Sequence, residues 1–312
     1  MTRTDYSAKI SAPQLFCLLM LSRLSAEIVY PRCGAGYGGE TMLAIIIAEL
    51  VRFVLGLPVI IYAFKGEFFY RAVWRKNKFF GWAAAIGAAA LLVGAAVRTL
   101  FSVTTFAGRN LLTGAPTYIL LGFVIAFSIY AAFMGAEAMS RAGVLFLIGA
   151  GIITLMVILA DIPYMDIRGA MPPQRSAYAQ FFEDVFERIL RGGDYLIFVV
   201  LLPYVKAKNN VSRGSVSLWF ALFSALAAVA LCGFYCLTLR ELYGLVEFPF
   251  SAAASLSDIA FFKRLDGVGA AIWTLCAALR TGLMLFCAWG AVAQLLQPKQ
   301  IPSEIPGKEE TA

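Results

Sequence analysis

The chain contains no histidine among its 312 residues, and charged side chains make up only 14% of them. Without histidine there is no Ser-His-Asp triad, and the commonest general base and the commonest zinc ligand are both missing. Five of the six cysteines lie in apolar runs, where a cysteine acts as a small hydrophobic side chain. No CxxC, HExxH or GxSxG pattern occurs, so we expect neither an enzyme nor a metal or cofactor site.

Hydrophobic residues, by contrast, make up 61% of the chain. Soluble proteins contain about 25% charged residues, and a water-soluble fold of this length could not cover its surface with so few. The composition therefore predicts an all-α polytopic membrane protein that interacts with membrane lipids. We expect a single transmembrane domain over residues 1–296 and a polar, disordered tail over residues 297–312.

The formal net charge of +7 would suggest nucleic-acid binding in a soluble protein. Here the lysines and arginines cluster in short loops, as the positive-inside rule requires of a membrane protein. We therefore expect no nucleic-acid partner and a cytoplasmic N-terminus. About nine crossings are predicted, and this odd number puts the C-terminal tail on the outer side. The predicted crossings are residues 14–30, 41–64, 81–107, 117–134, 144–160, a pair of half-helices at 178–190 and 195–205, then 216–239, 243–262 and a last one ending at Leu296.

The first crossing carries charges near its middle. Its length suits a bilayer crossing of about 17 to 25 residues, yet it contains Arg23 and Glu27 beside small residues. An ionised side chain at bilayer depth costs about 2.5–3.5 kcal/mol even on lenient scales, so both must face the protein interior or a watery cavity. Serines also weaken a helix interior. We expect the crossing to be broken here, as in transporters with a midplane site; the alternative is that Arg23 and Glu27 pair with each other.

A second break is expected where Gly192-Gly193-Asp194 separates an amphipathic segment from an apolar one. A surface helix followed by a short re-entrant helix is the alternative. With both crossings broken, backbone N–H groups at a half-helix start can hold a carboxylate, and Glu27 or Asp194 can receive an ammonium group. Arg98 would neutralise Glu27 when the site is empty. The candidate ligand-binding residues are Ser25, Ala26, Glu27, Arg98, Gly192, Gly193 and Asp194.

Four stretches resemble the spore germination permeases, the B subunits of spore germinant receptors, within the amino acid–polyamine–organocation superfamily. They are KISAPQLFCLLML, GAEAMSRAGVLFLI, RGGDYLIFVVLLPYVK and FFKRLDGVGAAIW. The resemblance covers nearly the whole chain and is carried by the order and spacing of these stretches. It implies a leucine-transporter-type fold of two inverted repeats, with crossings 1 and 6 broken around the ligand. It also implies an A-type membrane subunit and a C-type lipoprotein as partners, in the inner membrane of a spore.

The chain differs from this family in two respects. The tenth crossing is missing, replaced by the polar tail, and crossing 1 carries an Arg-x-x-x-Glu pair. The leading expectation is a subunit that binds a small nutrient, an amino acid, in a midplane pocket and signals germination. A proton- or sodium-coupled amino acid transporter is the first alternative. A structural membrane subunit with a decayed pocket is the second.

Overall fold

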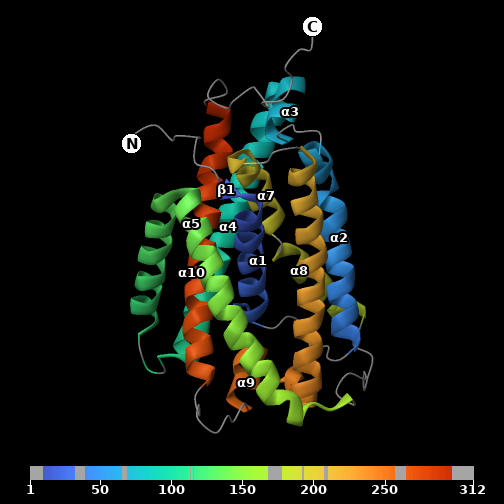
Figure 1. Cartoon of the computed structure of the whole chain (residues 1–312), viewed down its shortest axis with the longest axis vertical. Coiled ribbons are helices and arrows are strands. Elements are labelled where there is room, and N and C mark those ends of the chain that lie inside the picture. Colours follow the sequence, from blue (N-terminus) through green and yellow to red (C-terminus); the bar gives the residue numbers. More distant parts are fainter. Residues whose placement is uncertain are drawn as a thin grey trace.

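The computed structural model of the chain describes residues 10–31, 39–64, 69–112, 114, 116–167, 178–191, 193–206, 210–256 and 265–296. These residues form a bundle of helices with one pair of two-residue strands (Figure 1). The helices are α1 (Ala12–Val29), α2 (Gly39–Phe64), α3 (Phe69–Lys76), α4 (Lys78–Asn110), α5 (Thr117–Asp161), α6 (Tyr178–Leu190), α7 (Asp194–Leu201), α8 (Asn210–Leu239), α9 (Pro249–Leu256) and α10 (Leu265–Leu296). The predicted tail, 297–312, lies outside the described residues.

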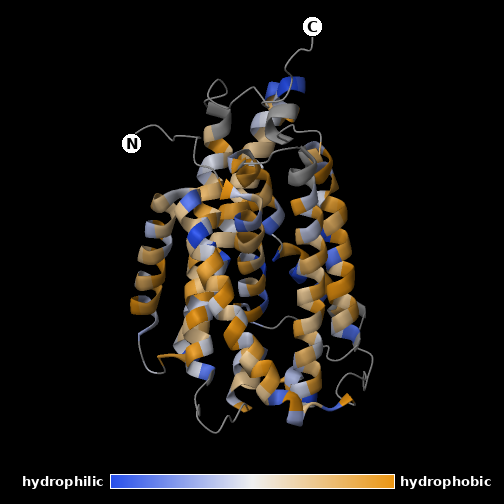
Figure 2. Ribbon diagram, in the orientation of Figure 1, coloured by the Kyte–Doolittle hydropathy of each residue, from blue (hydrophilic) through white to orange (hydrophobic). Residues whose placement is uncertain are grey.

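Six helices among the described residues are long and apolar enough to cross a membrane, namely α1, α2, α4, α5, α8 and α10. Large apolar side chains cover the outer faces of α2, α4 and α5, as lipid contact requires, and apolar residues dominate the ribbon in Figure 2. The all-α polytopic membrane class is therefore confirmed. Helix α10 runs through the interior, where it packs against α1, α4, α5, α7 and α9.

Helix α5 holds two predicted crossings, which fold back on each other at Gly135 (Figure 1). Gly135 has φ 85° and ψ 171°, a conformation that is essentially restricted to glycine. The chain can therefore reverse without a loop at this point. Glu137 and Arg141, four residues apart just beyond the kink, form an ion pair at 2.5 Å on an exposed face.

Replacing Gly135 by alanine is expected to lower the free energy of unfolding by about 1–3 kcal/mol, since the backbone there excludes a Cβ. The matched control is Gly151→Ala in the same helix, where an added methyl group meets nothing within 4 Å. That change should leave stability equal or raise it, because alanine favours the helix. Thermal unfolding of both purified variants is the measurement, and equal midpoints would contradict the argument.

The interruption predicted at Gly192-Gly193 is confirmed by the end of α6 at Leu190 and the start of α7 at Asp194, a feature that the broken crossing and its alternative, a surface helix before a re-entrant one, have in common. Helix α6 packs against α2, with Val185 between Ala44 and Ala48. Helix α7 instead contacts α1, α4 and α10. The two short helices thus have different neighbours, and the connection between the end of α6 and the start of α7 is called the joint below.

The predicted break in the first crossing is wrong, because α1 is continuous from Ala12 to Val29. Ser11 caps the start of the helix and forms a capping box with Gln14. Within it, the Ser25 hydroxyl donates to the Ser22 carbonyl, so the serine is accommodated by the helix. The Arg23–Glu27 pair, one turn apart, also spans the expected break and supports the helix.

The predicted crossing at 243–262 is also wrong. Helix α9 has eight residues, about 12 Å at 1.5 Å per residue, which is too short for a hydrocarbon core of about 30 Å. Helix α8 ends and α10 begins at the same end of the bundle, near α9 (Figure 1). Helix α10 then ends at the side where β1 lies, so the chain leaves the bundle at the end where it entered. The prediction that the two termini lie on opposite sides concerns residues 1–9 and 297–312, which lie outside the described residues, and it stays a prediction.

Strands β1 (Ile10–Ser11) and β2 (Val205–Lys206) pair in parallel, with Ile10 opposite Val205. They connect the start of α1 to the segment that follows α7. Short 3-10 turns complete the described elements: η1 (Ile162–Tyr164), η3 (Leu202–Tyr204) and η4 (Arg240–Gly244).

Candidate functional site

Arg23 of α1 is buried and holds two carboxylates. Its Nη2 lies 2.5 Å from Glu27 Oε1 and 2.5 Å from Glu49 Oε1 of α2. Glu49 also binds Arg52 at 2.7 Å, as the three-residue spacing of these two residues predicts. Buried charges are stable only in such paired arrangements, so this network fixes α1 against α2.

Glu27 faces a second arginine. Its other oxygen, Oε2, lies 3.9 Å from Arg188 of α6, and Arg188 also binds Asp184 at 3.0 Å. The charge that neutralises Glu27 is therefore Arg23, helped by Arg188, rather than Arg98. Arg98 pairs instead with Glu187 of α6, at a partly exposed position.

The joint between α6 and α7 carries a third cluster. The Ser22 hydroxyl donates to Asp194 Oδ1 at 2.5 Å, and Arg280 Nη1 of α10 lies 3.6 Å from the same oxygen. Arg280 also donates to the backbone carbonyls of Ser22 and Arg191. This cluster joins α1, α7 and α10 at the point where the α6–α7 segment is interrupted.

Tyr30, at the end of α1, lies among three guanidinium groups. Those of Arg98, Arg191 and Arg280 lie 5.6, 5.2 and 5.6 Å from the centre of its ring, within cation–π range. The Tyr30 hydroxyl makes a 2.7 Å hydrogen bond to Thr99 of α4. The Tyr30 ring therefore helps to keep the guanidinium groups of these three arginines close to the joint.

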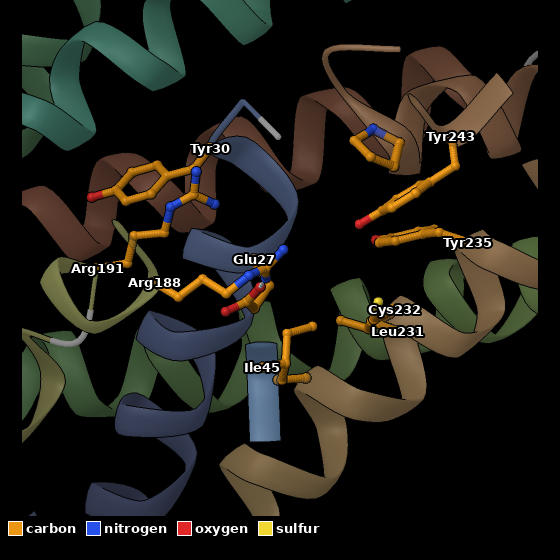
Figure 3. A pocket seen from close by; sticks show the side chains of 11 residues that line it. Glu27, Tyr30, Ile45, Arg188, Arg191, Leu231, Cys232, Tyr235 and Tyr243 are labelled. Atoms are coloured by element: carbon orange, nitrogen blue, oxygen red, sulfur yellow. Dashed lines mark ion pairs between the residues drawn. The ribbon is translucent and has the colours of Figure 1, made fainter. Parts of the chain in front are cut away.

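A small cavity opens beside these clusters (Figure 3). One wall carries charged and polar groups, namely Glu27, Tyr30, Arg188 and Arg191. The other wall is formed mainly by Ile45 of α2, residues 228–235 of α8, Tyr243 and Pro249. The centre of a water molecule can occupy about 20 Å³ of the cavity. This is room for about one water.

Two tyrosines stand at the α8 side of the cavity. The rings of Tyr235 and Tyr243 stack with centres 6.4 Å apart and planes 18° apart. Their hydroxyl groups point to the same side, toward Glu27 (Figure 3). The Tyr235 hydroxyl is buried and has no hydrogen-bond partner among the described residues. A buried hydroxyl without a partner marks a place where a polar group can bind.

Of the seven residues that the sequence singled out, Glu27 lines this cavity. Ser25 and Ala26 are buried in α1, and Asp194 is buried at the start of α7. Gly193 faces other helices, since a Cβ there would lie 3.4 Å from Met284 Cε and 3.6 Å from Ala95 Cβ. Gly192 lies outside the described residues. Asp194 does contact α1, but its hydrogen bond is to Ser22 and not to Ser25, which lies three residues further along the helix.

The polar residues that sequence reasoning missed were hidden by their context. Arg188 lies in an amphipathic segment, where an arginine is expected on the polar face, and Arg191 lies beside the glycines that follow it. Arg280 stands alone in a long apolar run, and a charge in such a run signals an interior partner. Nothing in the sequence around Tyr235 distinguishes it from other aromatic residues of a membrane helix.

The apolar helices, the interrupted α6–α7 segment and the buried charges beside it define a permease-like membrane protein. A family model described as spore germination protein matches residues 9–303. The chain therefore belongs to the spore germination permease family. A search of curated protein sequences finds no match.

Proposed function

We propose that this chain is the permease-like subunit of a spore germinant receptor, which binds a free amino acid in the cavity beside Glu27 and passes the signal to its partners. One observation carries the proposal: the cavity places a carboxylate and two guanidinium groups on one wall and a largely apolar surface on the other. An α-amino acid has this pattern of charges, with an apolar side chain in many cases. An A-type membrane subunit and a C-type lipoprotein, in the inner membrane of a spore, are part of the proposal.

Each end of the ligand has a partner in this arrangement. The ligand carboxylate would bind the guanidinium groups of Arg188 and Arg191, since charge-assisted hydrogen bonds from arginine suit a carboxylate. The ammonium group would bind Glu27 Oε2, the oxygen that faces away from Arg23. The Tyr235 hydroxyl would supply one further hydrogen bond. A cavity with room for about one water must widen to admit an amino acid, so binding changes the distance between its walls.

Ligand-induced stabilisation tests the proposal. The purified protein in lipid nanodiscs is heated with each of the twenty amino acids in turn, and an increased unfolding midpoint identifies a ligand. A ligand present at 100 times its Kd stabilises the folded state by about 2.7 kcal/mol. No stabilisation by any amino acid would support the structural subunit instead. Uptake of the identified amino acid into vesicles, driven by a proton or sodium gradient, would support the coupled transporter.

Tyr235→Phe is expected to weaken amino acid binding about fivefold, which corresponds to one hydrogen bond of about 1 kcal/mol. The same change should leave the stability of the free protein equal or slightly higher, because the hydroxyl has no partner among the described residues. Tyr195→Phe is the control, since Tyr195 packs against Phe220 and is not among the residues that line the cavity. Calorimetric titration with the identified ligand measures the affinity. An unchanged Kd for Tyr235→Phe would show that the Tyr235 hydroxyl does not bind the ligand.

A further inference from the structure

Arg280 lies within α10 and is only 1% exposed. Its guanidinium group reaches the joint between α6 and α7, where it meets three oxygen atoms. It donates to the backbone carbonyls of Ser22 and Arg191, the latter at 3.1 Å, and lies 3.6 Å from Asp194 Oδ1. These oxygens come from α1, from the end of α6 and from the start of α7. Three separate segments thus enclose one positive charge.

The joint has a negative potential for two reasons. The Arg191 carbonyl directly follows α6, whose C-terminal end carries a partial negative charge of about half a unit. Asp194 adds a full negative charge at the same place. In transporters with broken helices, free carbonyls and half-helix C-terminal ends bind the coupling cation. The oxygens around Arg280 form a cation site of this kind.

We propose that the Arg280 guanidinium occupies this cation site as a permanent part of the chain, so that the protein binds its amino acid without a coupling ion. A guanidinium group keeps its proton at any physiological pH, and its covalent attachment prevents it from crossing the membrane. Neither sodium nor a proton can therefore be exchanged at this site during a cycle. The inference rests on the proposed function and assigns the protein to sensing rather than to ion-driven uptake.

The atoms that Arg280 uses determine which free ion can replace it. The two terminal nitrogens, Nη1 and Nη2, make the contacts with Ser22, Arg191 and Asp194. The Nε atom is buried without a hydrogen-bond partner among the residues that the structure describes. A free guanidinium ion carries the same pair of nitrogens, so it can reproduce the contacts that Arg280 makes.

Chemical rescue of Arg280→Met tests the inference. This variant keeps the aliphatic part of the side chain, removes the guanidinium group and leaves Asp194 without its arginine, so its thermal unfolding midpoint should lie several degrees below that of the wild type. Guanidinium chloride at about 10 mM, far below the molar concentrations that denature proteins, should restore most of the loss, whereas equal choline chloride should not. The wild-type midpoint should stay the same when sodium is replaced by choline. Arg141→Met, at an exposed ion pair, should show no rescue.

The double variant Asp194→Asn/Arg280→Met keeps the test decisive if the single variant fails to fold. Removing both charges should restore folding relative to Arg280→Met alone, because no uncompensated charge stays buried. The inference would be overturned by a wild-type midpoint that rises saturably with sodium. A lack of rescue by guanidinium in a folded Arg280→Met protein, or a double variant no better than the single one, would overturn it too. No amino acid enters these measurements, so failure here is distinct from failure of the proposed function.

Discussion

Arg23→Met is expected to cause the largest loss of stability of any single change in the buried network. Arg23 is 2% exposed and binds both Glu27 and Glu49. Removing one partner of a buried ion pair costs about 3–5 kcal/mol, because the other charge stays buried without compensation. This amount is a large fraction of the stability of a typical protein. We expect the variant to accumulate poorly in the membrane, as measured by immunoblot and by size-exclusion chromatography of the solubilised protein.

Arg141→Met provides a matched control for this prediction. Arg141 and Glu137 form an ion pair with the same 2.5 Å distance and the same four-residue spacing, but their side chains are 70% and 44% exposed. Exposed pairs contribute about 0–1 kcal/mol, so this variant should accumulate normally. A second control adds Glu49→Gln to Arg23→Met, which removes one buried negative charge and should recover part of the loss. Equal accumulation of Arg23→Met and Arg141→Met would contradict the structural role of the network.

Glu27→Gln is expected to remove most of the affinity for the amino acid. Glutamine has nearly the same shape but no charge for the ligand ammonium group, and losing such a charged partner costs about 2–5 kcal/mol, or roughly 30-fold to several thousand-fold in Kd. Arg23 keeps Glu49 as a partner, so the protein should still fold and accumulate. The measurement is the Kd from calorimetric titration, compared with the wild type.

Glu49→Gln separates the loss of binding from the loss of an ion pair. Glu49 binds Arg23 at the same 2.5 Å as Glu27 does, and it also binds Arg52, yet it does not line the cavity. Its replacement should lower the unfolding midpoint and leave the Kd within a few-fold of the wild type. If Glu27→Gln and Glu49→Gln shifted the Kd equally, Glu27 would act through the network and the ligand would bind elsewhere.

The sequence predicted the features that depend on spacing within one segment. The interruption between α6 and α7, and the Arg23–Glu27 pair that was the alternative to a break in α1, follow from local rules for helices. The interruption expected in α1 was wrong because Arg23 finds Glu49 on another helix. In this chain the buried charge of Arg23 is paired across helices, and α1 stays continuous.

The site itself depends on contacts that no spacing rule supplies. Arg280 meets Asp194 across 86 positions of the sequence, and Tyr235 reaches the cavity from a helix that looks like any other apolar crossing. The eight residues of α9 were also assigned to a crossing, because apolar composition alone does not distinguish a short helix at the bundle end from a spanning one. Tertiary packing determines these features, and a single sequence shows only that buried charges need partners.

The parallel pair of β1 and β2 ties α1 to the segment that follows α7, which bears on how the cavity proposed as the ligand site can widen. Ile10 and Val205 join α1 and α7 at one end of the bundle, and the Ser22–Asp194 hydrogen bond joins them again further along. These two attachment points restrict the movement of α1 and α7 relative to each other. Helix α6 is attached to these two helices only through the joint at Gly193 and through side-chain contacts. We therefore expect the widening that the proposed function requires to come from a movement of α6 relative to α1 and α7, which would shift Arg188 away from Glu27.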